Sequence, residues 1–161
     1  MQPPFRIGLG YDIHTLAAGR PCILGGIKID SPVGPEGHSD ADVILHAVAD
    51  AILGASGLPD IGQLFPNTDP AIKNMNSARI VERAVQEAAA KGWAIGNLDI
   101  VVLAEKPKMA PHVPAIRKNL TALLGVTGDQ IGVKATTQEG MDAVGEGRAI
   151  ACHAVVLLVK A

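Results

Sequence analysis

Asp12 and His14 are the first residues of the sequence whose chemistry suggests a site. They follow residues 5–10, a short apolar stretch whose composition is typical of a β-strand. In an extended segment alternate side chains point to the same side, so a carboxylate and an imidazole two positions apart can bind one metal ion. An Asp-x-His pair is common, however, and on its own it favours a polar loop after the strand.

His46 is the third candidate ligand. Asp42, His46 and Asp50 are spaced four apart within an apolar repeat typical of a helix, and therefore line one face of it. A solvent-facing side would explain both carboxylates but explains His46 less well, because its sequence neighbours are aliphatic. A buried histidine needs a polar partner, and a metal ion shared with Asp12 and His14 is one solution. Two imidazole nitrogens, one carboxylate oxygen and an open position form the ligand set of catalytic zinc sites.

His38 and Ser39 stand where this helix is predicted to begin. Ser39 with Asp42 forms a capping-box signature, so the sequence predicts a helix start at Ser39. The free N–H groups and the macrodipole of a helix N-terminus favour bound anions such as phosphate, beside which His38 would then lie. The alternative, equally compatible with these residues, is that Ser39 is only a cap and that His38 is exposed.

Two further segments contain groups suited to phosphates or to a flat ligand. A strand predicted over residues 131–136 ends at Thr136 and Thr137, whose hydroxyls can donate to phosphate oxygens, and Glu139 can hold a hard cation such as Mg²⁺. Thr-Thr is also ordinary strand composition. The proline-rich turn over residues 104–112 has backbone groups that could bind the edge of a flat ligand, whereas composition alone favours a helix lead-in with exposed lysines.

Strands and helices must position these residues. Periodicity and turn residues predict strands over residues 5–10, 22–29, 98–104, 131–136 and 149–160, and helices over residues 77–91, 113–124 and from 39 to the glycines at 54–57. Gly25-Gly26 suggests a bulge in the second strand or a close approach of the backbone, and residues 58–70 form a long loop. This order predicts an α+β two-layer sandwich, a mixed β-sheet with helices on one face. The last strand is apolar on both sides, so its second face needs cover that a partner subunit could supply.

Composition limits the class of protein. The 161 residues predict a single domain over residues 1–161. Lys and Arg total 14 against 16 Asp and Glu, and aromatic residues are 2%, which disfavours nucleic acid as a partner. The longest apolar run near the C-terminus, residues 154–159, is too short to cross a bilayer. Cys22 and Cys152 are too few for a disulfide framework, and nothing at the N-terminus is typical of a signal peptide, so we expect a cytoplasmic protein.

Taken together, these segments resemble the 2-C-methyl-D-erythritol 2,4-cyclodiphosphate synthase family of the non-mevalonate isoprenoid pathway. They span almost the whole chain in the order of the family. The matching stretches are Arg6-Ile7-Gly8-Leu9-Gly10-Tyr11-Asp12-Ile13-His14, His38-Ser39-Asp40-Ala41-Asp42, Asp60-Ile61-Gly62, Phe65-Pro66-Asn67-Thr68-Asp69, Lys106-Pro107-Lys108-Met109 with Pro111-His112, and Val133-Lys134-Ala135-Thr136-Thr137.

The resemblance implies an activity and an assembly. The implied reaction cyclises 4-diphosphocytidyl-2-C-methyl-D-erythritol 2-phosphate to 2-C-methyl-D-erythritol 2,4-cyclodiphosphate and releases CMP, which makes the enzyme a phosphorus–oxygen lyase. The step is a metal-assisted intramolecular phosphoryl transfer. The implied assembly is a homotrimer whose sheets pack around the trimer axis and whose active sites lie between neighbouring subunits.

The resemblance also implies roles for individual residues. The implied ligands of one divalent metal, usually zinc, are Asp12, His14 and His46. Glu139 is the implied ligand of a second cation, usually magnesium, beside the substrate diphosphate. His38 and Thr137 are implied to steady phosphates in the transition state, as catalytic residues. The residues implied to bind substrate are Ser39, Asp60, Ile61, Gly62, Phe65, Asn67, Thr68, Asp69, Ala104, Pro107, Lys108, Met109, Ala110, Thr136 and Arg148.

The sequence departs from the family pattern at two places. Asn67 stands where the pattern Phe-Pro-Asp-Thr-Asp usually has its first Asp, which removes a charge. Many members have Gly-Arg-Gly-Glu-Gly before the last strand, but here Glu146 precedes Gly147 and the basic residue is displaced to Arg148. The contacts of Glu146 and Arg148 therefore do not follow from the resemblance.

Two other functions are compatible with the same residues. A zinc-dependent phosphohydrolase would activate a metal-bound water, with Asp60 available as its base, and would yield an open-chain product. A trimeric metal-stabilised binding protein would lose stability, but no catalytic rate, when His46 is replaced by Ala.

Overall fold

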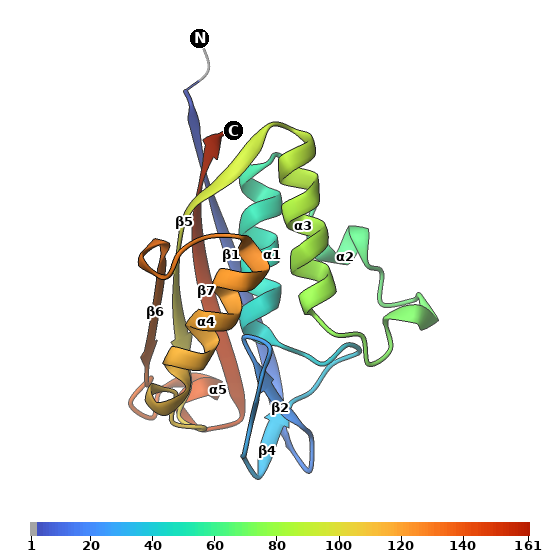
Figure 1. The fold of residues 1–161 in the computed structure, drawn as a ribbon. Helices are drawn as coiled ribbons and strands as arrows, with labels where there is room; N and C mark the ends of the chain where they lie inside the picture. Colours follow the sequence, from blue (N-terminus) through green and yellow to red (C-terminus); the bar gives the residue numbers. More distant parts are fainter. Residues whose placement is uncertain (1–2) are drawn as a thin grey trace.

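A five-stranded sheet organises the computed structural model, which describes residues 3–161 (Figure 1). The strand order is β4-β1-β7-β5-β6; β5 and β6 run parallel, and the other neighbours are antiparallel. The predicted mixed sheet is therefore confirmed. The bounds are Phe5–Ala18 for β1, Val33–Pro35 for β4, Trp93–Leu103 for β5, Ile131–Thr136 for β6 and Ala149–Lys160 for β7.

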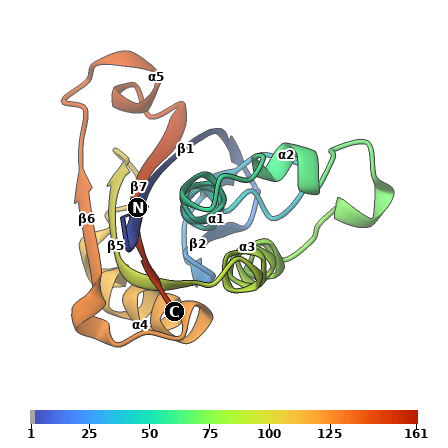
Figure 2. The same ribbon diagram turned by 90° about the horizontal axis from the view of Figure 1, so that it is seen from above.

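Three helices cover one face of this sheet (Figure 2). They are α1 (Val43–Ala55), which packs on β1 and β7, α3 (Ala78–Ala90) and α4 (Val113–Leu124). The apolar core lies between these helices and the sheet. The α+β class with mixed sheet and helices is thus confirmed. The shorter elements are β2 (Cys22–Leu24), β3 (Ile27–Ile29), α2 (Ile61–Leu64) and α5 (Asp142–Gly145), with 3₁₀ turns at Pro70–Ile72, Ala110–His112 and Gly128–Gln130.

Gly8 and Gly10 let helix α1 approach strand β1 very closely. A Cβ atom on Gly10 would lie 1.8 Å from the carbonyl oxygen of Ala47, and one on Gly8 would lie 1.9 Å from that of Ala51. Both distances are far inside van der Waals contact, so no larger residue fits while the helix keeps its position. This close approach places the first two turns of α1 beside the second half of β1.

Asp42 fixes the beginning of α1. Its carboxylate accepts hydrogen bonds from the backbone N–H groups of Ile44 and Leu45, each at 3.1 Å, and from those of Gly25 and Gly26 at 2.9 and 2.7 Å. Burial raises the pKa of Asp42 to about 6, against the opposing effect of these N–H donors. Only the ionised carboxylate, which has no hydrogen of its own, offers all its oxygen lone pairs to these four donors.

Three predictions about this region are wrong. The helix begins at Val43 with Asp42 as its cap, because the Asp42 carboxylate accepts from the free N–H groups of Ile44 and Leu45, whereas Ser39 accepts only from the N–H of Ala41, ahead of the helix. Asp42 is fully buried, so it does not belong to a solvent-facing side of the helix. Gly25-Gly26 forms the turn of a tight hairpin between β2 and β3, with positive φ at both residues, and is not a bulge in one strand. The alternative, a close approach, is found: a Cβ atom on Gly25 would lie 2.5 Å from Cγ2 of Ile116.

Other differences concern the length of elements. β1 continues through Asp12 and His14 as far as Ala18, because β7 pairs with residues 5–15 and β4 pairs with residues 16–18. β5 begins at Trp93 and not at residue 98, and the long loop after α1 contains the one-turn helix α2. The predicted helices after residues 77 and 113 are confirmed, the latter ending at the left-handed Gly125.

The face of the sheet opposite the helices carries exposed apolar side chains. Alternate residues of β1 from Phe5 to Ile13 are 43 to 67% exposed, and Val155 of β7 is 44% exposed. The prediction that the last strand is apolar on both sides agrees with this distribution.

Among the helices within residues 3–161, none combines the length and apolar character needed to span a membrane.

We expect Gly10→Ala to destabilise the protein by about 3 kcal/mol or more, because the added methyl group must push α1 away from β1. Urea denaturation measures this change. Gly54→Ala is the matched control: it lies inside the same helix in open space, so the free energy of unfolding should rise by up to about 1 kcal/mol. Equal stabilities of Gly10→Ala and the unsubstituted protein would contradict the close-packing argument.

Candidate metal-centred active site

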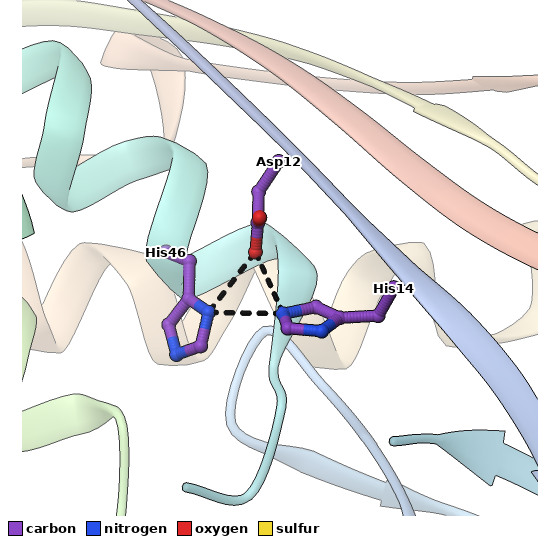
Figure 3. Close-up of side chains that lie close together, drawn as sticks. All are labelled: Asp12, His14 and His46. Atoms are coloured by element: carbon purple, nitrogen blue, oxygen red, sulfur yellow. Dashed lines mark hydrogen bonds and ion pairs between the residues drawn. The ribbon is translucent and has the colours of Figure 1, made fainter. Parts of the chain in front are cut away.

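Asp12, His14 and His46 converge where β1 meets α1 (Figure 3). Oδ2 of Asp12 lies 2.8 Å from Nε2 of His14 and 3.0 Å from Nδ1 of His46, and the two ring nitrogens are 3.2 Å apart. The two β1 residues point to the helix-covered side, as their spacing predicts. The triad predicted from the sequence is therefore brought together within a few ångströms.

Hydrogen bonds outside the triad determine which ring nitrogens carry protons. Nδ1 of His14 lies 3.0 Å from the carbonyl oxygen of Glu36, which can only accept, so this nitrogen carries the hydrogen in the neutral ring. Ser77 donates its hydroxyl hydrogen to Oδ1 of Asp40, and its oxygen, 2.9 Å from Nε2 of His46, therefore accepts from that nitrogen. Nε2 of His14 and Nδ1 of His46 are left with lone pairs facing Asp12.

This arrangement fits a divalent metal ion. Two nitrogen lone pairs and one carboxylate oxygen point into a common space, where without a cation or a proton they would repel one another. Outer hydrogen bonds that fix the histidine tautomer are the usual second layer of a metal site. The predicted binding of a divalent metal at these three residues is consistent with the donor set and its orientation.

Protons compete with a metal ion for the ligand atoms of the triad. Burial raises the pKa of Asp12, but hydrogen bonds from His14 and His46 outweigh it and lower this pKa to about 2. Burial also acts to lower the pKa of His14, and the hydrogen bond and charge of Asp12 outweigh it, so this pKa is raised. In the metal-free protein a proton on His14 is therefore stabilised by Asp12.

A cavity of about 340 Å³ opens beside the triad. Asp50, four residues after His46, lines it and accepts a hydrogen bond at 2.8 Å from the backbone N–H of Ile61, which anchors α2 at the rim. Sequence reasoning left Asp50 as a solvent-facing carboxylate; its spacing from His46 was the available signal. The predicted site residues that line this cavity are Asp12, His14, His38, Ser39, His46, Asp60, Ile61, Gly62, Phe65 and Asn67.

A second cavity of about 600 Å³ adjoins the first at His38 and Asn67 and contains the predicted residues Thr68 and Asp69. Arg20 and Lys73 also line it and were missed, because each stands alone in a loop without a motif. The expectation that His38 lies directly at a helix N-terminus is wrong. The helix starts at Val43, and the N–H groups of its first turn are bonded to Asp42, so an anion beside His38 would meet other donors.

The remaining predicted residues lie elsewhere, after the ends of β5 and β6. Leu103 and Ile13 both pair with Ala151, so the ends of β5 and β6 lie at the same height along the strands as the triad. Across the sheet, however, β6 is three strands from β1, a separation of roughly 14 Å. The N–H of Gln138 donates to Glu105 at 2.7 Å and joins the two loops. The residues of this second group are Ala104, Pro107, Lys108, Met109, Ala110, Thr136, Thr137 and Glu139.

Within this group Met109 is 4% exposed, so its side chain belongs to the core and only its backbone can face a ligand. Glu139 is exposed and has a left-handed backbone with φ of 50°. Arg148 does not line the cavity beside the triad; its guanidinium pairs with Glu146 at 2.5 Å on the surface, which identifies the contact that the sequence left open.

A mixed α+β fold with a carboxylate and two imidazoles at the floor of a polar cavity defines the chain as a metal-binding protein of the enzyme type. The model of the YgbB family matches residues 5–159, and the chain belongs to this family. The predicted family resemblance is confirmed by curated relatives. The 2-C-methyl-D-erythritol 2,4-cyclodiphosphate synthase of Pelobacter propionicus is 53% identical over 154 residues, which cover 96% of this chain and 98% of the relative.

Solved structures agree with this assignment. The structure of IspF from Plasmodium falciparum in complex with CDP is 39% identical, covers 99% of both chains and has a TM-score of 0.88. The bifunctional IspDF from Campylobacter jejuni has a TM-score of 0.94 at 37% identity, over 98% of this chain and 42% of that one. The similarity therefore extends over the whole of the fold described above.

Replacing Ser77 by Ala should weaken metal binding at the triad by up to about tenfold, because Nε2 of His46 loses the nearer of its two hydroxyl partners and keeps only Ser39, at 3.2 Å. Competition with a chromophoric chelator measures the dissociation constant. Ser56→Ala removes an equally buried serine at the far end of α1 and should leave the constant unchanged. If both variants bind metal like the unsubstituted protein, Ser77 does not orient His46.

Metal affinity should fall as the pH is lowered, by about tenfold for each pH unit below the pKa of His14, because the metal binds only the deprotonated ring. The raised pKa places this loss nearer to neutrality than an ordinary histidine would. Asp12, with its pKa of about 2, stays ionised and does not contribute. Chelator competition at several pH values between about 5 and about 8 tests this; a constant affinity over this range would refute it.

Proposed function

We propose that the protein catalyses the cyclisation of 4-diphosphocytidyl-2-C-methyl-D-erythritol 2-phosphate to 2-C-methyl-D-erythritol 2,4-cyclodiphosphate, with release of CMP. The observation that supports this most strongly is the Asp12, His14 and His46 site, with its outer hydrogen bonds, in a chain 53% identical to a synthase of that name. The CDP bound to the Plasmodium falciparum relative supports a cytidine-bearing substrate.

The reaction requires little covalent chemistry from the protein. An oxygen of the 2-phosphate forms a bond to the β-phosphorus, and the bond from that phosphorus to the bridging oxygen breaks, so that CMP leaves with the electron pair. Both partners are anionic, and the protein must reduce their repulsion and hold them in line. A protein nucleophile is not needed.

In this mechanism the residues of the first cavity hold the reacting phosphates. A divalent ion held by Asp12, His14 and His46 would supply positive charge to a phosphate oxygen. His38 and Ser39 lie on the same cavity wall and would steady a phosphate by hydrogen bonds. Asp60 and the start of α2 at Ile61 and Gly62, anchored through Asp50, would orient the erythritol hydroxyl groups. Phe65, Asn67, Thr68 and Asp69 of the following segment would take part in this.

The second group of residues would hold the nucleotide end. Thr136 and Thr137 are exposed and offer hydroxyls to the phosphates of the cytidine portion, while Thr137 steadies the transition state. The backbone of the loop from Ala104 to Ala110, with Pro107, Lys108 and Met109, would bind the base. Arg148 would approach substrate only by leaving its pairing with Glu146.

We infer different metals for the two groups. Two imidazoles and one carboxylate favour zinc at Asp12, His14 and His46. A single carboxylate such as Glu139, completed by diphosphate oxygens and water, favours magnesium.

A homotrimer is proposed because one chain separates the two groups by three strands, whereas a single substrate must touch both. The exposed apolar face of β1 and β7 is suited to burial against copies of itself around an axis, which would bring one subunit's nucleotide group to its neighbour's metal group. Each chain would be one domain over residues 1–161, and we place the enzyme in the cytoplasm, in keeping with its two free cysteines.

Phosphorus NMR of the reaction products tests the proposed function. Incubation with the diphosphocytidyl substrate and Mg²⁺ should yield CMP and a cyclic diphosphate, and prior removal of the tightly bound metal by a chelator should abolish both. An open-chain product would instead support the phosphohydrolase, and the absence of turnover by folded, metal-loaded protein would support a binding protein.

Mixing two inactive variants tests whether the site lies between subunits. His46→Ala removes the metal group and Thr137→Ala the nucleotide group, and each should reduce kcat by at least about 100-fold. After random assembly from equal amounts, about a quarter of all interfaces pair two intact halves, so the mixture should recover about a quarter of the activity. No recovery, with mixed assembly verified by mass spectrometry, would mean that each chain uses its own two groups.

A further inference from the structure

A basic pocket lies at the end of the sheet opposite the catalytic residues. Arg6, Lys160 and Trp93 come from the neighbouring strands β1, β7 and β5; Arg6 pairs with Leu158, and Trp93 pairs with Lys160. Leu158 is fully buried under the helices, so strand alternation puts Lys160 on the same helix-covered face. Ser56 and Lys91, the residues that end α1 and α3, complete the wall. Figure 1 shows both helices ending at this end of the molecule.

The pocket combines positive charge with an aromatic surface. It has a volume of about 340 Å³ and is lined by Pro3, Arg6, Ser56, Lys91, Trp93 and Lys160. Of the residues that the structure describes, three cations and no carboxylate therefore line it. The guanidinium carbon of Arg6 lies 5.0 Å from the centre of the Trp93 ring, a stacking distance that restricts the arginine. Among the ion pairs formed within residues 3–161, none involves these three cations.

The ends of the two helices do not account for this charge. Each helix C-terminus contributes about half a negative charge, so two ends offset only about one of the three positive charges. Several of the last carbonyl groups already accept backbone hydrogen bonds: Ser56 and Gly57 donate to Ile52 and Gly54 in α1, and Lys91 donates to Ala88 in α3. Among the side-chain hydrogen bonds within residues 3–161, none joins the three cations to a helix carbonyl. Their clustering costs free energy unless an anion joins them.

We propose that this pocket binds a phosphate-bearing small molecule of about the size of a diphosphate. The planar guanidinium, held on Trp93, can form paired hydrogen bonds to one phosphate group, and the two lysines supply mobile positive charges around it. Arg6 precedes Asp12 by six residues of one continuous strand, or roughly 20 Å. The pocket is therefore separate from the metal centre and independent of the function proposed above.

Trp93 provides a direct readout, because it is the only tryptophan in the sequence. Titration of the metal-loaded protein with pyrophosphate at constant ionic strength should change its fluorescence saturably, with a dissociation constant on the order of 1 mM or below. Inorganic phosphate and CMP, titrated in the same way, show whether one phosphate suffices and whether an ester is accepted. The absence of saturable change up to about 10 mM pyrophosphate would overturn the proposal.

Charge-removing variants separate this pocket from a general charge effect. Lys91→Gln with Lys160→Gln, two exposed positions, should weaken pyrophosphate binding at least about tenfold and leave turnover of the cyclisation substrate unchanged. Lys28→Gln with Lys118→Gln removes the same charge at exposed positions elsewhere and should leave the affinity unchanged. Equal affinity in the first double variant, or an equal loss in the control, would overturn the proposal.

Discussion

The contact between helix α1 and strand β1 determines most of the catalytic geometry. Two glycines on the helix-facing side of β1 bring its backbone against the carbonyl groups of Ala47 and Ala51. Only at this separation can a histidine in the first turns of the helix reach a carboxylate and a second histidine on the strand. Because β7 pairs with β1 along eleven residues, the strand cannot yield to a displaced helix. The close packing of α1 on β1 therefore also sets the positions of the metal ligands. The stability of the fold and the placement of these ligands depend on the same atoms.

Hydrogen bonds fix the position of the first turn of α1. The Asp42 carboxylate binds the first turn of α1 and the β2–β3 hairpin at once, so the helix cannot slide along its axis without breaking bonds to Gly25 and Gly26. Asp40, two residues earlier, binds both the backbone N–H and the hydroxyl of Ser77. Through Ser77 this short segment also sets the proton position on His46. Two neighbouring carboxylates thus have different tasks, one in placing the helix and one in orienting a ring.

Sequence periodicity was sufficient for the helices after residues 77 and 113, for the last two strands and for the mixed sheet, because burial of one face imposes a repeat. It was insufficient where long-range contacts decide. Whether Ser39 or Asp42 caps the helix depends on the hairpin that surrounds Asp42, and the extent of β1 depends on β7, more than 130 residues later. The triad could be proposed from Asp12, His14 and His46 because metal ligands need complementary chemistry. Ser77 and Arg20 carried no such mark, since a lone serine or arginine is ordinary on any surface.

The topology of the sheet explains why the predicted site residues fall into two groups. In the order β1-β7-β5-β6, the strand with Asp12 and His14 and the strand that ends at Thr136 can never be neighbours within one chain. The strand between β1 and β5 is also the one whose second face is apolar and partly exposed. The same sheet therefore has two features: an apolar surface whose burial favours association, and a site whose two groups are separated within one chain. Association through that surface offers a physical reason for both features, because the free energy gained by burial would also hold the two groups in register.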